Sequence, residues 1–225
     1  MAAVSRYLRL CRIEAPLTDG VAVSGAQPAD QNWAWWPLLP LYPFGQRRTL
    51  RCELVPGQIW SFEQLQGVFF VAVPIRMTAV KLKDGLLLYA PVAATAECIA
   101  LVRELEADHG PVRTIVHPSS SGLEHKVGVP AMARAFPEAD VWVTPGQWSF
   151  PVSLPLSWLG FPHGRTKVLF DDGLPHGDEM CWEQLGPVPL GPGPFCEATV
   201  LHLASGSLLC TDALVSISEQ WPELL

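Results

Sequence analysis

The chain has 225 residues, of which 49% are hydrophobic and 16% are charged. So large an apolar fraction excludes intrinsic disorder, because burial of apolar surface can offset the entropy lost when the backbone is ordered. The net charge is −7 and no cluster of Lys and Arg occurs. Nucleic acid is therefore disfavoured as a partner, since phosphate backbones are bound through basic residues.

The first 13 residues contain three arginines and no acid, which resembles a transit sequence, but they lack the long apolar core of a secretory signal. The longest uncharged run, residues 141–164, contains four prolines, which argue against a membrane-spanning helix. Six cysteines are scattered without a CxxC pair, a pattern typical of free thiols in a reducing compartment.

Residues 1–30 show no sustained period and indicate a weakly ordered N-terminal extension, followed by a single domain over 31–225. Three prolines at intervals of three forbid a helix in residues 33–44 and favour an extended ribbon. Trp33, Trp35 and Trp36 lie in this ribbon, and such large apolar side chains need to be covered.

Residues 51–88 have a β pattern, and Asp-Gly at 84–85 predicts a hairpin turn between strands 77–82 and 86–90. The period then changes to that of a helix, with Thr95 as its N-cap and Gly110 beyond its end. The apolar face of this helix predicts four buried side chains: Cys98, Leu101, Val102 and Leu105.

A short strand over residues 112–116 leads to His117, and a loop over 118–123 follows. A second helix is predicted from the apolar face formed by Val129, Met132, Ala133 and Phe136. Residues 140–143 form another strand, residues 144–165 and 171–195 are predicted as loops, and residues 198–212 form a closing hairpin. This alternation of strands and helices indicates an α/β fold.

The segment from His117 to the adjacent pair Glu124-His125 is the main candidate for chemistry. A histidine at a strand end and an acid-His pair at the next helix could converge on a metal ion or a proton-transfer site. The alternative is structural, with Glu124 and His125 capping the helix start. The serines of 119–121 could offer a nucleophile, but serines in a loop more often form turns.

Several segments resemble the metallo-β-lactamase superfamily, and more closely an uncharacterised family of it, found chiefly in cyanobacteria and plastids and known only as a domain of unknown function. The resemblance covers residues 33–220 and is most specific in PGQWSFPVSLPLSWLGFP, with support from WWPLLPLYPFGQRRT, VPIRMTAVKL, SGLEHKV and LLCTDA. It implies an αββα sandwich that is shortened in its second half.

The resemblance also implies a site that has lost most of its metal ligands. In the superfamily motif H-x-H-x-D-H, Glu124 and His125 match the last two positions, while Ser120 and Gly122 replace the leading histidines. Asp212 matches the metal-bridging aspartate, and two later histidines have no counterpart. His117, Glu124, His125 and Asp212 are therefore the expected remnant-pocket residues, with no bound metal and no assigned catalytic residue.

These features predict a catalytically degenerate protein with a binding or scaffold role, in the cytoplasm or chloroplast stroma of a photosynthetic cell. One alternative is a hydrolase with an atypical site for a single zinc or iron ion. Another is a peripheral, non-spanning membrane protein that uses its Trp- and Pro-rich segments. A protein partner is unidentified, and an aromatic contact surface is expected at Trp33, Trp35, Trp36, Trp148 and Trp158.

Overall fold

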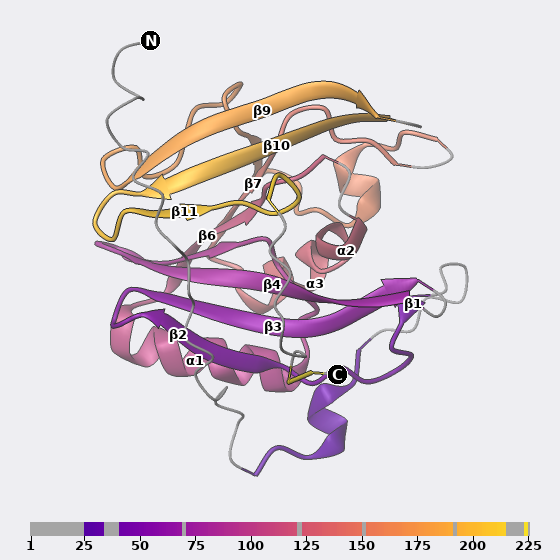
Figure 1. The fold of residues 1–225 in the computed structure, drawn as a ribbon, viewed down its shortest axis with the longest axis vertical. Helices are drawn as coiled ribbons and strands as arrows, with labels where there is room; N and C mark the ends of the chain where they lie inside the picture. The colour runs from indigo at the N-terminus through magenta and orange to yellow at the C-terminus, as the bar shows by residue number, and fades with distance from the viewer. Residues whose placement is uncertain are drawn as a thin grey trace.

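The computed structural model describes residues 25–33, 41–68, 71–120, 123–149, 152–190, 193–214 and 223–224 (Figure 1). Its helical elements are η2 (Pro28–Gln31), α1 (Ala96–His109), α2 (Leu123–Lys126), α3 (Val129–Ala135) and η3 (Leu156–Leu159). Its strands are β1 (Leu41–Tyr42), β2 (Leu50–Val55), β3 (Ile59–Val68), β4 (Val71–Leu82), β5 (Gly85–Tyr89), β6 (Val112–His117), β7 (Asp140–Val143), β8 (Thr166–Val168), β9 (Met180–Leu190), β10 (Gly193–His202) and β11 (Ser207–Leu209).

The strands form two sheets. The larger, mixed sheet has the order β1-β3-β4-β5-β6-β7-β8, with β2 also paired to β3. Strands β1 to β5 pair antiparallel, whereas β5 to β8 pair parallel. The smaller sheet is antiparallel in the order β11-β10-β9. Every residue of β5 and β6 but one is buried, as expected of strands covered on both faces.

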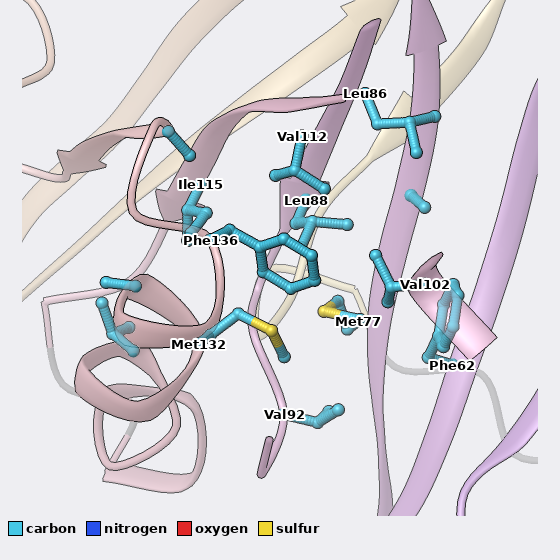
Figure 2. Close-up of a cluster of buried hydrophobic side chains, with 14 of the residues drawn as sticks. Phe62, Met77, Leu86, Leu88, Val92, Val102, Val112, Ile115, Met132 and Phe136 are labelled. Atoms are coloured by element: carbon cyan, nitrogen blue, oxygen red, sulfur yellow. The ribbon is translucent and has the colours of Figure 1, made fainter. Parts of the chain in front are cut away.

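Two hydrophobic cores separate three layers. One core lies between the large sheet and the helices, where Met132 and Phe136 of the α3 region point toward Met77 of β4 (Figure 2). The other lies between the two sheets, and includes Leu87 of β5 and Trp182 of β9. The predicted α/β fold is confirmed: helices cover one face of the large mixed sheet, and the small sheet covers the other.

The helix predicted after Pro91 is confirmed. Thr95 accepts a hydrogen bond from the backbone amide of Cys98 at 3.1 Å, and Gly110 ends the helix with a φ of 90°. The predicted hairpin is also confirmed, with Lys83 and Asp84 between the paired residues Leu82 and Gly85. The side chains predicted to form the core on both helices are all buried: Cys98, Leu101, Val102, Leu105, Val129, Met132, Ala133 and Phe136.

The prediction of a loop over residues 171–195 was wrong, because the 11-residue strand β9 occupies most of its second half. The strand was not predicted because it contains three residues typical of loops, Gly186, Pro187 and Pro189. β9 lies at an edge of the small sheet, where a proline can be accommodated since one side of the strand makes no ladder hydrogen bonds. Met180 and Trp182 alternate with exposed neighbours, which is the ordinary pattern of a strand with one buried face.

The predicted domain start at residue 31 lies at the end of η2. The amide of Trp33 donates to the carbonyl of Gly45, and that of Arg47 donates to the carbonyl of Gln31, so this part of the chain is tied to the domain. Residues 1–24 and 34–40 lie outside the described residues. None of the helices in the described part of the chain is long and apolar enough to cross a membrane.

Candidate functional site

His117 ends β6, between the parallel neighbours β5 and β7. The side chain is completely buried, and neither ring nitrogen has a hydrogen-bond partner among the described residues. Burial, followed by the positive charges of Lys126 and His125, holds the pKa of His117 well below its ordinary value of 6.5. The imidazole is therefore neutral at physiological pH.

The acid-His pair lies in α2, a separate four-residue helix, whereas the sequence predicts it at the start of the helix that carries Val129. His125 is buried, and its Nδ1 is 3.2 Å from the carbonyl oxygen of Pro91. The backbone of Glu124 is part of the same helix. The side chain of Glu124 lies outside the described part of the structure.

Lys126, the next residue, is the main addition to this site. Its ammonium donates to the carbonyl oxygens of Ser120 and Trp148, both at 2.8 Å, and lies 5.9 Å from the centre of the Trp148 ring. Only 9% of Lys126 is exposed, and burial lowers the pKa of its amine to about 8. A buried positive charge thus links the loop after β6 to the loop after β7.

The serines that follow β6 are used as structural hydrogen-bonding groups. The hydroxyl of Ser120 donates to the carbonyl of Pro194 and accepts from the amide of Cys196, each at 2.8 Å. The hydroxyl of Ser119 donates to the carboxylate of Asp212 at 3.1 Å. Both serines are completely buried, which favours the turn interpretation over a nucleophile. Ser121 lies outside the described residues.

Asp212 is held beside Ser119 by a second carboxylate. Glu197 of β10 is completely buried, and it accepts hydrogen bonds from the backbone amides of Thr211 at 2.6 Å and Ala213 at 2.8 Å. Ser119 and Glu197 also form an isolated antiparallel bridge. The structure therefore brings Asp212 to the loop that follows His117.

We call this region the junction, formed by residues 117–120 with their contacts at 125–126, 144–148, 194–197 and 211–213. Buried polar atoms without a partner among the described residues lie in it besides His117: Oε1 of Gln147 and Oγ1 of Thr211. Gln147 donates to the carbonyls of Ser119 and Thr144. Unpaired buried polar atoms are costly and often mark functional or hydrated positions.

The described residues contain no group of three or more His, Cys, Asp and Glu side chains placed to hold a metal ion, and the side chain of Glu124 is outside them. His125 and Asp212 each have hydrogen-bonded protein neighbours, and the Lys126 ammonium occupies the space between the loops. Catalytic zinc needs at least three protein ligands around one ion, and a cation among them would oppose its binding.

The five tryptophans expected to form one contact surface differ in their surroundings. Trp33 is half-buried under the guanidinium of Arg47, 3.5 Å from its ring centre. Trp148 is also half-buried and donates to the carbonyl of Pro194 at 3.2 Å. Trp158 is 77% exposed. Trp35 and Trp36 lie outside the described residues, so the packing of this ribbon against residues 148–161 stays a prediction.

Sequence reasoning missed Lys126, Glu197 and Gln147. The one available signal was the position of Lys126 directly after the acid-His pair in a chain with 15 Lys and Arg. Glu197 and Gln147 lie 80 and 30 residues beyond His117, and only the pairing of distant strands brings them together.

The model of one family, described as "Domain of unknown function (DUF4336)", matches residues 56–225 of the chain. No curated protein matches it in sequence.

The structure is similar to solved metallo-β-lactamases. DIM-1, exposed to ceftazidime, is 14% identical over 72% of this chain and 68% of its own, with a TM-score of 0.48. The enzyme from Pontibacter korlensis is 15% identical over 72% and 70%, with a TM-score of 0.46. FIM-1 from Pseudomonas aeruginosa, in its mono-zinc form, is 15% identical over 68% and 63%, with a TM-score of 0.44. At these values the likeness is a similarity alone and carries no further conclusion about this chain.

Proposed function

The chain belongs to the DUF4336 family, and we propose that it is a catalytically degenerate protein that acts by binding a partner or as a scaffold. The junction is its preserved but chemically altered site. Its setting is the cytoplasm or the chloroplast stroma of a photosynthetic cell, and its partner is a protein.

The observation that carries this proposal is the position of the Lys126 ammonium. Two loops that could open toward a ligand are instead joined by hydrogen bonds from one buried cation to the carbonyls of Ser120 and Trp148. A charge-assisted hydrogen bond is worth about 1.5–3 kcal/mol. The ammonium thus supplies, from within the chain, two hydrogen bonds that hold the loops together.

The hydroxyls and carboxylates nearby support the same interpretation. Ser119 and Ser120 donate to protein acceptors, and Glu197 is occupied by backbone amides. A nucleophile needs a base within hydrogen-bond reach and access to substrate, and neither serine has exposed surface. These side chains are thus committed to the structure of the junction.

Metal analysis of protein purified without chelator tests the proposal. We expect less than one equivalent of tightly bound transition metal, and no β-lactamase, glyoxalase or phosphodiesterase activity above background. His125→Ala should lower the thermal stability, because it removes the contact with Pro91, without changing the metal content. Two equivalents of zinc that are lost in His125→Ala would overturn the proposal, and a single equivalent with hydrolytic activity would favour the single-metal hydrolase.

A further inference from the structure

We propose that residues 152–159 form a membrane-contact surface, which places apolar side chains in the headgroup region of a lipid bilayer. This proposal rests on different residues from those of the junction, and it does not depend on the proposed function.

The segment exposes large apolar side chains over a short stretch of chain. Val152 is 64% exposed, Leu154 is 40% exposed and Trp158 is 77% exposed. Single exposed aliphatic residues are common on protein surfaces, but tryptophan is on average highly buried. Three such residues within seven positions therefore indicate a surface that is covered by something else.

Local hydrogen bonds hold the first part of this surface in place. The hydroxyl of Ser149 donates to the carbonyl of Val152 at 2.7 Å and accepts from the amide of Leu154 at 2.8 Å. One side chain thus holds the backbone at Val152 and Leu154, whose own side chains are exposed.

The second part is anchored on the core. Leu156 and Leu159, at the two ends of η3, pack against the core between the large sheet and the helices, and Phe161 just beyond is 3% exposed. Trp158 lies between these two anchors in the sequence and is exposed. A surface that is already ordered loses little conformational entropy when it binds.

The surface itself carries no acidic side chain that would oppose contact with a bilayer. Residues 141–164 contain no Asp, Glu, Lys or Arg, in a chain whose net charge is −7. Most natural membrane surfaces carry anionic lipids, which repel acidic protein surfaces and attract basic ones. Tryptophan is the side chain most typical of the membrane interface, where its ring is partly apolar and its N–H is hydrated.

The apolar side chains supply most of the expected affinity. Lys167 is paired with Asp140 at 2.7 Å, and Arg165 donates to the backbone carbonyls of Ala133 and Ala139, so both cations are partly compensated. The acidic remainder of the chain acts only within a Debye length, about 8 Å at physiological salt. Binding should therefore be weak, reversible and strengthened only modestly by anionic lipid.

The test is cosedimentation of the full chain with phosphatidylcholine vesicles that contain a quarter phosphatidylglycerol. We expect the wild type to bind, and the combined variant Val152→Ser, Leu154→Ser, Trp158→Ser to bind at least tenfold more weakly. The matched control is Leu203→Ser with Leu208→Ser, which removes two leucines of similar exposure from the β10–β11 hairpin and should bind like the wild type. All five positions are exposed, so circular dichroism and the melting temperature should stay unchanged in both variants.

Two results would overturn the proposal. One is the absence of wild-type sedimentation at millimolar lipid. The other is equal binding by the wild type and the triple variant. If the wild type is a dimer by light scattering, the triple variant is a monomer and neither binds vesicles, the surface is an interface between copies of the chain. Quenching by brominated lipid that is lost in Trp158→Phe would place this ring in the bilayer.

Discussion

Glu197, which is completely buried, accepts a hydrogen bond of 2.6 Å from the backbone amide of Thr211, the residue before Asp212. This pairing, with its companion from Ala213, fixes the turn that carries Asp212. The turn is thus shaped by a carboxylate on β10, 14 residues earlier in the chain.

Glu197→Gln should lower the free energy of unfolding by about 1–3 kcal/mol, because the amide nitrogen cannot accept from a backbone N–H. Hydrogen exchange at the amides of Thr211 and Ala213 should accelerate in the same variant. Chemical denaturation and exchange measured by mass spectrometry check both effects. Glu183→Gln, an exposed change on β9, is the control, and unchanged exchange in Glu197→Gln would contradict the prediction.

Leu105→Ala should destabilise the protein by about 2–5 kcal/mol, as expected when a large side chain is removed from a packed core. Leu105 is 6% exposed on the face of α1 that packs against the large sheet. Asp108→Ala, one turn later on the exposed side of α1, should change the stability by less than about 0.5 kcal/mol. Equal denaturation midpoints for the two variants would exclude this part of α1 from the core.

His117→Leu should leave the protein as stable as the wild type at pH 7, or more stable. The substitution removes two ring nitrogens that lack partners among the described residues and keeps a buried apolar volume.

The same variant should also resist acid better. The pKa of His117 lies below its ordinary value, so below pH 6.5 the unfolded chain binds a proton that the folded chain does not, and the stability falls as the pH falls. This loss, at most about 1.4 kcal/mol per pH unit, should be smaller in His117→Leu. Urea denaturation between pH 7 and pH 5 checks it, with His163→Gln on the surface as control. Parallel pH profiles for the wild type and His117→Leu would contradict it.

Lys126→Met should destabilise the junction, because the carbonyls of Ser120 and Trp148 both lose their donor. The destabilisation should grow as the pH rises from about 8 toward 10. In that range the folded amine, with its pKa lowered to about 8, has lost its proton, while the unfolded lysine still holds one, so the wild type gains stability relative to the variant. Lys81→Met, an exposed lysine on β4, is the control. A constant difference between the wild type and Lys126→Met from pH 7 to pH 10 would show that this amine titrates normally.

The sequence allowed prediction of those parts of the fold that depend on local pattern. The apolar face of α1, its Thr95 cap and the β4–β5 hairpin are all encoded within a few residues, and each is confirmed. β9 was missed because its prolines are tolerated only at a sheet edge, and the sequence does not show which strand lies there.

At the junction, too, some features could be predicted from the local sequence and others could not. The position of His117 at a strand end could be predicted from the sequence pattern, whereas His125 lies in a short helix before the predicted one. The roles of Lys126 and Glu197 depend on contacts between residues far apart in the chain, such as the 22 residues between Lys126 and Trp148. Burial then lowers the pKa of the Lys126 amine, and no local sequence pattern predicts this burial.

The order of the strands along the chain has a consequence for biosynthesis. Strands β1 to β8 are complete at residue 168, but the sheet that covers Leu87 and Val116 is formed only by residues 180–209. A ribosome that adds about 5–20 residues per second therefore holds, for an interval on the order of seconds, a nascent chain whose large sheet has one uncovered apolar face. If translation stops within this interval, the released fragment has an exposed apolar sheet face and is prone to aggregate. The strands of residues 180–209 cover this face and thereby protect the newly made protein from aggregation.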